Sequence, residues 1–277
     1  MEIEQSGHEA SEESPARYGT SKLTFRGPAR DLSGAYVACL GGTETRGNFI
    51  DRPWPALLED GIGLPCVNFG WPNAGPDVIL NDAGLLALAT AARAVVLQTL
   101  PAMNLSNPYY TVHPRRNDRF LCGTPLLRRL YPEVDFTEFH FTRHMMRRLS
   151  RLCPARFAEL RQALQEVWVT RMRGVLTRIE PPVVLLWLAD HPPGDGTGSA
   201  DLCDDPAFVS RAMMQAIAPG TARVVEVVTR PEVRTQARRR TAMSRIEQSA
   251  AAQLPGSQAH DAAANALLPA LREILAT

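Results

Sequence analysis

The chain has 277 residues, of which 45% are hydrophobic. That length supports a sizeable core and is long for one domain but short for two, so we expect one domain with insertions. The 30 basic and 29 acidic residues leave a net charge of +1. No overall field therefore favours nucleic acid or a membrane surface, and any argument from charge must be local.

The five cysteines lie far apart and show no C-x-x-C spacing. This pattern is typical of a reducing compartment, and we expect Cys39 and Cys66, which lie in apolar runs, to fill the core. No apolar stretch reaches 18 residues, and the N-terminus lacks the basic-then-apolar pattern of a signal peptide. We therefore expect a cytoplasmic protein without a membrane span.

Residues 1–16 are acidic, with five glutamates before the first arginine at position 17, and they contain few apolar residues. This composition predicts a disordered tail. Residues 17–277 are then expected to form a single α/β domain. Residues 101–135 hold six prolines or glycines among charged and aromatic residues, which indicates a long loop within an insertion at about 101–178.

Apolar runs bounded by glycine, proline or polar residues predict buried strands at 35–40, 65–69, 94–100, 182–189 and 222–229. Helical patterns lie between them, at 53–60, 77–92, 136–151, 154–178, 206–217, 232–252 and 261–276. The alternation predicts a three-layer sandwich around a five-stranded parallel sheet. Asp261 is in position to cap the last helix.

The segment 41–47, Gly-Gly-Thr-Glu-Thr-Arg-Gly, follows the first apolar run. It places the Thr43 hydroxyl at a strand-to-helix turn, where α/β folds hold reactive groups. Thr43 is a candidate nucleophile, but a threonine here also serves as a simple helix cap. Glu44 and Thr45 are candidate substrate contacts, although a glutamate at a helix N-terminus is favourable without any further role.

A basic loop follows the third predicted strand. His113, Arg115, Arg116 and Arg119 fall within seven residues, with Asp118 among them and Pro114 excluding a helix. These side chains can converge on an anion. The alternative is a surface loop whose arginines pair with the acidic stretch Glu133, Asp135 and Glu138.

Other polar residues follow predicted strand ends. Asn104 and Asn107 lie past the third strand and His191 past the fourth, where each could contact substrate or form an ordinary turn.

Arg143 begins an arginine-rich helical face that is either solvated or a wall of the anion site. The cluster Arg238–Arg240, within 234–245, has no interleaved aromatic residues, so nucleic-acid binding is not expected. His140 and His144 lack a third ligand, and we expect no metal.

In their order, these features resemble the SGNH, or GDSL-type, hydrolase superfamily over roughly residues 35–110 and 255–276. The block G-D-S-x-T-x-G is mirrored by 41–47, with Gly42 in place of aspartate and Thr43 in place of the nucleophilic serine. The second block looks like 68–75, which contains Asn73 and ends at Gly75, and Asn104 occupies the place of the third. His260 matches the histidine of the last block, D-x-x-H, while Ser257 stands where its aspartate should be.

The resemblance implies a flavodoxin-like sheet, Thr43 as nucleophile, His260 as general base, and Gly42, Gly75 and Asn104 as oxyanion donors. The departures weaken that mechanism, because a carboxylate normally fixes the tautomer of the histidine. The region of about 17–145 also resembles an uncharacterised bacterial domain family that carries G-G-T-E-T, N-A-G-x-D and V-H-P-R-R-N-D-R-F runs. That second resemblance implies no activity.

We therefore expect an SGNH-like enzyme that hydrolyses or transfers an acyl group on an anionic or acylated small molecule, such as a sugar or lipid headgroup. Two alternatives stay open. One is a lapsed scaffold that binds an anionic glycan or nucleotide, and the other is a sulfo- or phospho-group transferase, which no P-loop or dinucleotide fingerprint supports. We expect no cofactor, and the sequence leaves the oligomeric state open.

Overall fold

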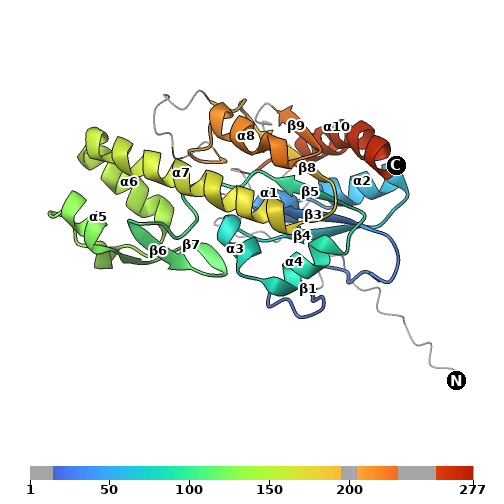
Figure 1. Cartoon of the computed structure of the whole chain (residues 1–277), viewed down its shortest axis with the longest axis horizontal. Helices are drawn as coiled ribbons and strands as arrows, with labels where there is room; N and C mark the ends of the chain where they lie inside the picture. The colour runs from blue at the N-terminus through green and yellow to red at the C-terminus, as the bar shows by residue number, and fades with distance from the viewer. Residues whose placement is uncertain (1–14, 195–201, 203–204, 230–253, 277) are drawn as a thin grey trace, which may run out of the picture.

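The computed structural model describes residues 15–194, 202, 205–229 and 254–276. Its centre is a five-stranded parallel sheet in the order β4-β3-β5-β8-β9 (Figure 1). The strands are β3 (Val37–Gly41), β4 (Cys66–Gly70), β5 (Ala94–Gln98), β8 (Val183–Ala189) and β9 (Arg223–Val228). All five predicted strands are confirmed, as is the α/β class.

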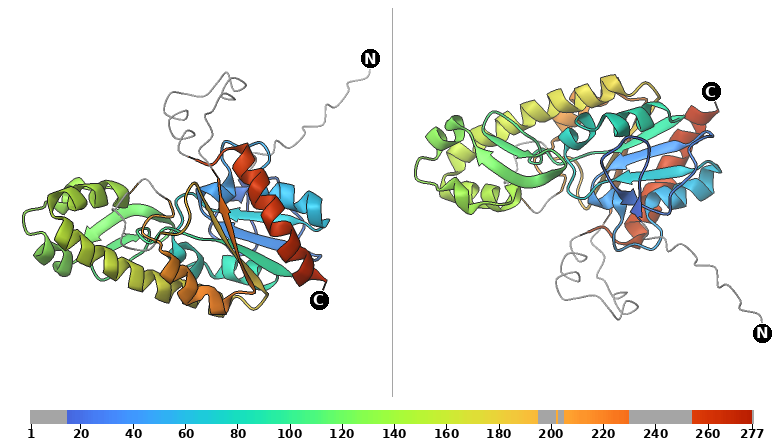
Figure 2. Two further views of the ribbon diagram at one scale, coloured as in Figure 1. Left: turned by 90° about the horizontal axis from the view of Figure 1, so that it is seen from above. Right: turned by 90° about the horizontal axis from the view of Figure 1, so that it is seen from below.

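Helices cover both faces of this sheet, which explains why the inner strands β3, β5 and β8 are buried along their whole length, whereas the edge strand β9 is mostly exposed. Val37 and Cys39 pack in the layer of α2 (Trp54–Ile62) and α10 (Ser257–Leu275). Ala38 and Leu40 point to the opposite layer, which is formed by α3 (Pro76–Leu80), α4 (Ala83–Thr90), α7 (Pro154–Arg178) and α8 (Arg211–Ile217). Figure 2 shows α10 lying across one side of the sheet.

The region predicted as a long loop has regular structure, so that prediction is wrong. It contains the antiparallel hairpin of β6 (Tyr110–His113) and β7 (Arg116–Gly123) and the helix α5 (Pro125–Leu130). After this region come η1 (Phe136–Glu138) and α6 (Thr142–Leu152). The hairpin buries Val112 and Phe120 in a second apolar cluster beside the sheet. Charged residues between these apolar positions conceal the strand pattern in the sequence.

Helix α7 joins this cluster to the main core. Leu160 and Leu164 in its first half belong to the second cluster, while Trp168 and Met172 in its second half belong to the core beneath the sheet. Figure 1 shows α7 running beside both parts. The division into one domain with an insertion at about 101–178 stays a prediction.

Several helix boundaries differ from those predicted. The expected helix 77–92 is divided into α3 and α4, because the Asp82 side chain accepts the N–H of Leu85 at 2.8 Å and starts a new helix. The expected helix 136–151 opens as η1, and α6 begins only at Thr142. Helix α8 begins at Arg211 behind its cap Ser210. The predicted helix 232–252 and the Arg238–Arg240 cluster lie outside the described residues.

The two ends of the fold also differ from the predictions. Residues 1–14 of the predicted tail lie outside the described residues, but Pro15–Ala16 form β1, which pairs with β2 (Phe25–Arg26) and buries Ala16. Helix α10 begins at Ser257 behind Gly256, so Asp261 lies inside the helix and is not its cap. Cys39 and Cys66 are buried as predicted. Within the described ranges, no helix has the length and apolarity to span a membrane.

Candidate functional site

The segment 41–47 turns from β3 into α1 (Thr43–Arg46), a single helical turn at the carboxyl end of the sheet. Carboxyl ends of neighbouring parallel strands meet at one edge, which here brings the turn beside the ends of β4 and β5. The predicted site residues of the G-G-T-E-T run therefore lie at the expected edge.

Gln98, the last residue of β5, organises this turn. Its Oε1 atom accepts hydrogen bonds from the N–H of Gly42 at 3.0 Å, the N–H of Thr45 at 3.1 Å and the Thr45 hydroxyl at 2.5 Å. Its Nε2 atom donates to Oε2 of Glu44 at 2.8 Å. Because three donors converge on one oxygen, the orientation of the buried amide is fixed, with its nitrogen toward Glu44.

Gly41 is required by the close approach of this amide. A Cβ atom at position 41 would lie 2.0 Å from the Thr45 hydroxyl oxygen and 2.6 Å from Oε1 of Gln98. The G-G-T-E-T run is thus shaped around one buried amide. Gln98 was not among the predicted site residues, although a polar residue ending the apolar run 94–97 is a signal that could have identified it.

The carboxyl group of Glu44 has a raised pKa. Burial, together with the nearby negative charge of Asp205, raises its pKa above the ordinary value, and the hydrogen bond from Gln98 and the charge of Arg143 only partly oppose this rise. Asp205 accepts hydrogen bonds on both oxygens from Nη2 of Arg143, at 2.7 and 2.6 Å. A carboxyl group with a raised pKa at a strand end is suited to proton transfer.

Asn73 faces Thr43 from the loop after β4. Its backbone N–H donates to the Thr43 hydroxyl oxygen at 2.9 Å, and that hydroxyl makes a long 3.5 Å contact to Oδ1 of Asn73. Asn73 has a positive φ of 52°, a conformation that asparagine adopts more readily than most residues. The structure therefore brings together the predicted residues Thr43, Glu44 and Asn73.

The three predicted oxyanion donors all have partners inside the protein. The N–H of Gly42 donates to Gln98, and the N–H of Gly75 donates to Oδ1 of Asn117 at 3.0 Å. The amide nitrogen of Asn104 donates to the backbone oxygen of Asn73 at 3.0 Å. These groups hold the loops together in this structure, and their role as oxyanion donors stays a prediction.

His260 lies in the first turn of α10 and is buried. Its Nδ1 atom accepts the backbone N–H of Trp54 at 3.0 Å. The neutral ring then carries its proton on Nε2, so this tautomer offers no nitrogen that could take a proton from Thr43. The pairing of Thr43 with His260 is not formed.

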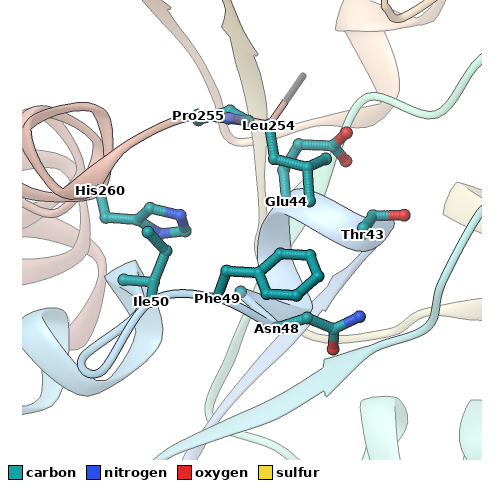
Figure 3. Close-up of a pocket in the computed structure, with 9 residues that line it drawn as sticks. Thr43, Glu44, Asn48, Phe49, Ile50, Leu254, Pro255 and His260 are labelled. Atoms are coloured by element: carbon teal, nitrogen blue, oxygen red, sulfur yellow. The ribbon is translucent and has the colours of Figure 1, made fainter. Parts of the chain in front are cut away.

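A small cavity of about 10 Å³ lies between these two residues, and both of them line it. In Figure 3 the Thr43 hydroxyl points away from the imidazole, and the side chains of Phe49 and Leu254 lie between them. The wall of the cavity is otherwise largely apolar, with Ile50 and Pro255. Thr43 therefore presents its hydroxyl to Asn73 on the other side of α1.

The basic loop is the turn of the β6–β7 hairpin. Nδ1 of His113 accepts the N–H groups of Arg115 and Arg116, both at 3.2 Å, so this histidine stabilises the turn. Trp71, after β4, donates its indole N–H to the backbone oxygen of Arg115, which holds the turn beside the site. Arg119 stacks over the ring of Phe141 at 4.8 Å.

The structure does not show the alternative, in which these arginines pair with the acidic stretch Glu133, Asp135 and Glu138. Glu133 pairs with Arg156, and Asp135 accepts the N–H and hydroxyl groups of Thr137. The charges of Arg119 and Arg116 instead lie close enough to Asp118 to lower its pKa, although burial outweighs them and leaves that pKa raised. Anion binding by this loop stays a prediction.

The remaining candidates have local structural roles. Oδ1 of Asn107 accepts the N–H groups of Tyr109 and Tyr110, at 2.9 and 3.2 Å, and forms a turn. His191 packs edge-on against Trp187, with ring centroids 5.6 Å apart. Thr45 is buried and bonded to Gln98. Among the described residues, no group of three histidine, cysteine or carboxylate side chains is placed to hold a metal ion.

The fold and this strand-end site define an α/β protein with a five-stranded parallel sheet. Residues 1–275 match the family model "Domain of unknown function (DUF6473)", and the chain belongs to that family. A comparison with curated proteins found no match.

Two solved structures are similar to the chain at a low level. One is a protein from Lactobacillus plantarum, with a TM-score of 0.40 and 13% identity, covering 86% of this chain and 97% of that one. The other is the lipase Lip_vut3 from a goat rumen metagenome, with a TM-score of 0.34 and 13% identity, covering 87% and 97%. Likenesses at this level support no conclusion about activity.

Proposed function

We propose that the chain is an enzyme that acts on an anionic or acylated small molecule, such as a sugar or lipid headgroup, by acyl-type hydrolysis or transfer. The observation that carries the proposal is the joint placement of a hydroxyl and a carboxyl group at the β3–α1 turn. Thr43 and Glu44 are adjacent there, and burial raises the pKa of Glu44. A hydroxyl beside a carboxyl group of raised pKa is an arrangement for nucleophilic and acid-base chemistry.

In this proposal Thr43 is the nucleophile or the hydroxyl that orients the substrate, and Glu44 exchanges the proton. His260 is not the base in this proposal, because its Nδ1 atom already accepts the backbone N–H of Trp54. The guanidinium groups of Arg116 and Arg119 supply positive charge beside the site, which suits a substrate with a negative end.

The second candidate is a protein that binds such a molecule without turning it over. The engagement of the Gly42, Gly75 and Asn104 donors inside the protein favours it, because an enzyme of SGNH type needs free donors for the oxyanion. No observation in the site favours sulfo- or phospho-group transfer.

A panel of acyl esters, with and without a carboxylate or phosphate on the acyl or alcohol part, tests the first candidate. We expect Thr43→Val and Glu44→Gln each to lower turnover by about 100-fold or more, since both remove a reacting group and keep the shape. Thr170→Val, on the exposed face of α7, is the matched control and should leave turnover unchanged.

If the wild type hydrolyses an ester and both Thr43→Val and Glu44→Gln hydrolyse it at the same rate, the enzymatic proposal for this site is wrong. If the wild type turns over no ester but binds the carboxylated or phosphorylated compounds by calorimetry, and Arg116→Ala weakens that binding, the second candidate holds instead.

A further inference from the structure

The β6–β7 hairpin is anchored to the sheet by a buried side chain. Oδ1 of Asn117 accepts the N–H of Gly75 at 3.0 Å and the N–H of Val78 at 3.1 Å, at the start of α3. Its Nδ2 atom donates to the backbone oxygen of His113 at 3.0 Å. Asn117 is fully buried. Its amide therefore fixes the position of the hairpin against the loop that follows β4.

The next residue, Asp118, lies where the register of the hairpin is irregular, because Arg116 and Phe120 pair with the consecutive residues His113 and Val112. Its side chain reaches the same loop after β4. Oδ2 of Asp118 accepts a hydrogen bond from Nδ2 of Asn73 at 3.2 Å. The hydroxyl of Thr142, in α6, also contacts the backbone oxygen of Asp118, at 3.4 Å.

The bond from Asn73 to Asp118 fixes the orientation of the Asn73 amide. With its nitrogen toward Asp118, the amide presents Oδ1 to the Thr43 hydroxyl, while the Asn73 backbone N–H binds the hydroxyl oxygen. An amide turned the other way would point its nitrogen at the Thr43 hydroxyl, which already accepts the backbone N–H of Asn73, and would leave Asp118 without this bond. The two contacts together select one side-chain rotamer of Thr43.

We infer that Asp118 is a positioning residue, which acts through Asn73 to hold the Thr43 hydroxyl in a single orientation toward the site. The inference rests on the proposed function of Thr43 and adds to it a residue that the inserted hairpin supplies. The role requires a hydrogen-bond acceptor at position 118 but does not require its negative charge, because the acceptor binds a neutral N–H group of the Asn73 amide.

This requirement gives a sharp pair of variants. Asp118→Asn keeps an acceptor oxygen of the same size, so it should preserve the Thr43 rotamer. Asp118→Ala removes the acceptor and should let the Asn73 amide rotate. Asp31→Ala is the matched control, since within the part of the chain that the structure describes this exposed carboxylate bonds to Ser33 alone.

The first measurement is independent of activity. In protein labelled with ¹³C and ¹⁵N at threonine, the three-bond couplings to the Thr43 methyl carbon report its χ1 angle. We expect one rotamer in the wild type, in Asp118→Asn and in Asp31→Ala, and averaged couplings in Asp118→Ala. A single unchanged rotamer in Asp118→Ala would overturn the inference.

The second measurement separates this inference from the proposed function. With any ester that the wild type hydrolyses, Asp118→Ala should lower kcat by about 10-fold or more with little change in KM, and Asp118→Asn should restore it. A loss of kcat in Asp118→Asn equal to that in Asp118→Ala would overturn the positioning role in favour of a carboxylate one. Averaged Thr43 couplings in Asp118→Ala, with no ester hydrolysed by the wild type, would support the inference while removing the proposed function.

Discussion

His260 and Trp54 are joined by a hydrogen bond of 3.0 Å from the backbone N–H of Trp54 to Nδ1 of the imidazole. Trp54 is the first residue of α2, whose N-cap Pro53 offers no side-chain acceptor. A histidine from α10 thus satisfies a helix N-terminal donor that the local sequence leaves open. The relationship links the two helices that cover one face of the sheet.

Replacing His260 by leucine should lower the free energy of unfolding by about 1–3 kcal/mol, because the buried Trp54 N–H loses its acceptor. Urea unfolding measures this loss. Asp261→Asn, on the exposed side of the same helix, is the control and should change little. Equal stability of His260→Leu and the wild type would show that the bond contributes nothing.

Gln98→Leu should destabilise the protein on the order of 3 kcal/mol, since it leaves the donors of Gly42 and Thr45 without their acceptor. It should also raise the pKa of Glu44 further, because the Gln98 hydrogen bond lowers it. Chemical denaturation and carboxyl ¹³C titration measure the two effects.

The matched control for this variant is Gln162→Leu, because the exposed amide of Gln162 bonds to Glu166 on the same helix and to no other described residue. A Gln98→Leu protein with the stability of that control, or with a lowered Glu44 pKa, would contradict the role assigned to the buried amide.

The raised pKa of Glu44 predicts a specific pH dependence. The folded state binds this proton more tightly than the unfolded state does, so its contribution to stability falls as pH rises from the ordinary value of 4.5 through the raised value. Glu44→Gln removes the titration and keeps an acceptor for Gln98. The stability of the variant relative to the wild type should therefore increase from pH 4 to pH 8.

Urea unfolding of both proteins across that range checks the prediction, and the other raised carboxyl groups, Asp77 and Asp118, cancel in the difference. Stability curves that stay parallel at every pH would show that Glu44 titrates normally.

Gly75→Ala should destabilise the protein by about 3 kcal/mol or more, because a Cβ atom there would lie 1.5 Å from the backbone oxygen of Asn104. Two loops would have to separate to make room. Gly34→Ala, where a Cβ atom meets nothing within 4 Å, is the control. Thermal unfolding compares the two, and similar melting temperatures would contradict so close an approach.

The sequence by itself determined the sheet. Runs such as 183–189 and 94–97 are continuous and apolar because both faces of a central parallel strand are buried, and this pattern requires no knowledge of distant partners. Helix α7 was predicted with its observed ends, Pro154 and Arg178, since its apolar spacing is regular. The turn at Thr43 was also located, because strand ends and glycines identify it locally.

Only the tertiary structure decided which polar groups meet at that turn. Gln98 reaches it from β5, and Asn117 and Asp118 reach it from the β6–β7 hairpin. His260 is turned toward Trp54 by the packing of α10 on α2. Periodicity reports which face of an element is buried. It carries no information on the partner of a single side chain, because hydrogen-bond partners 30 to more than 200 residues apart are selected by packing alone.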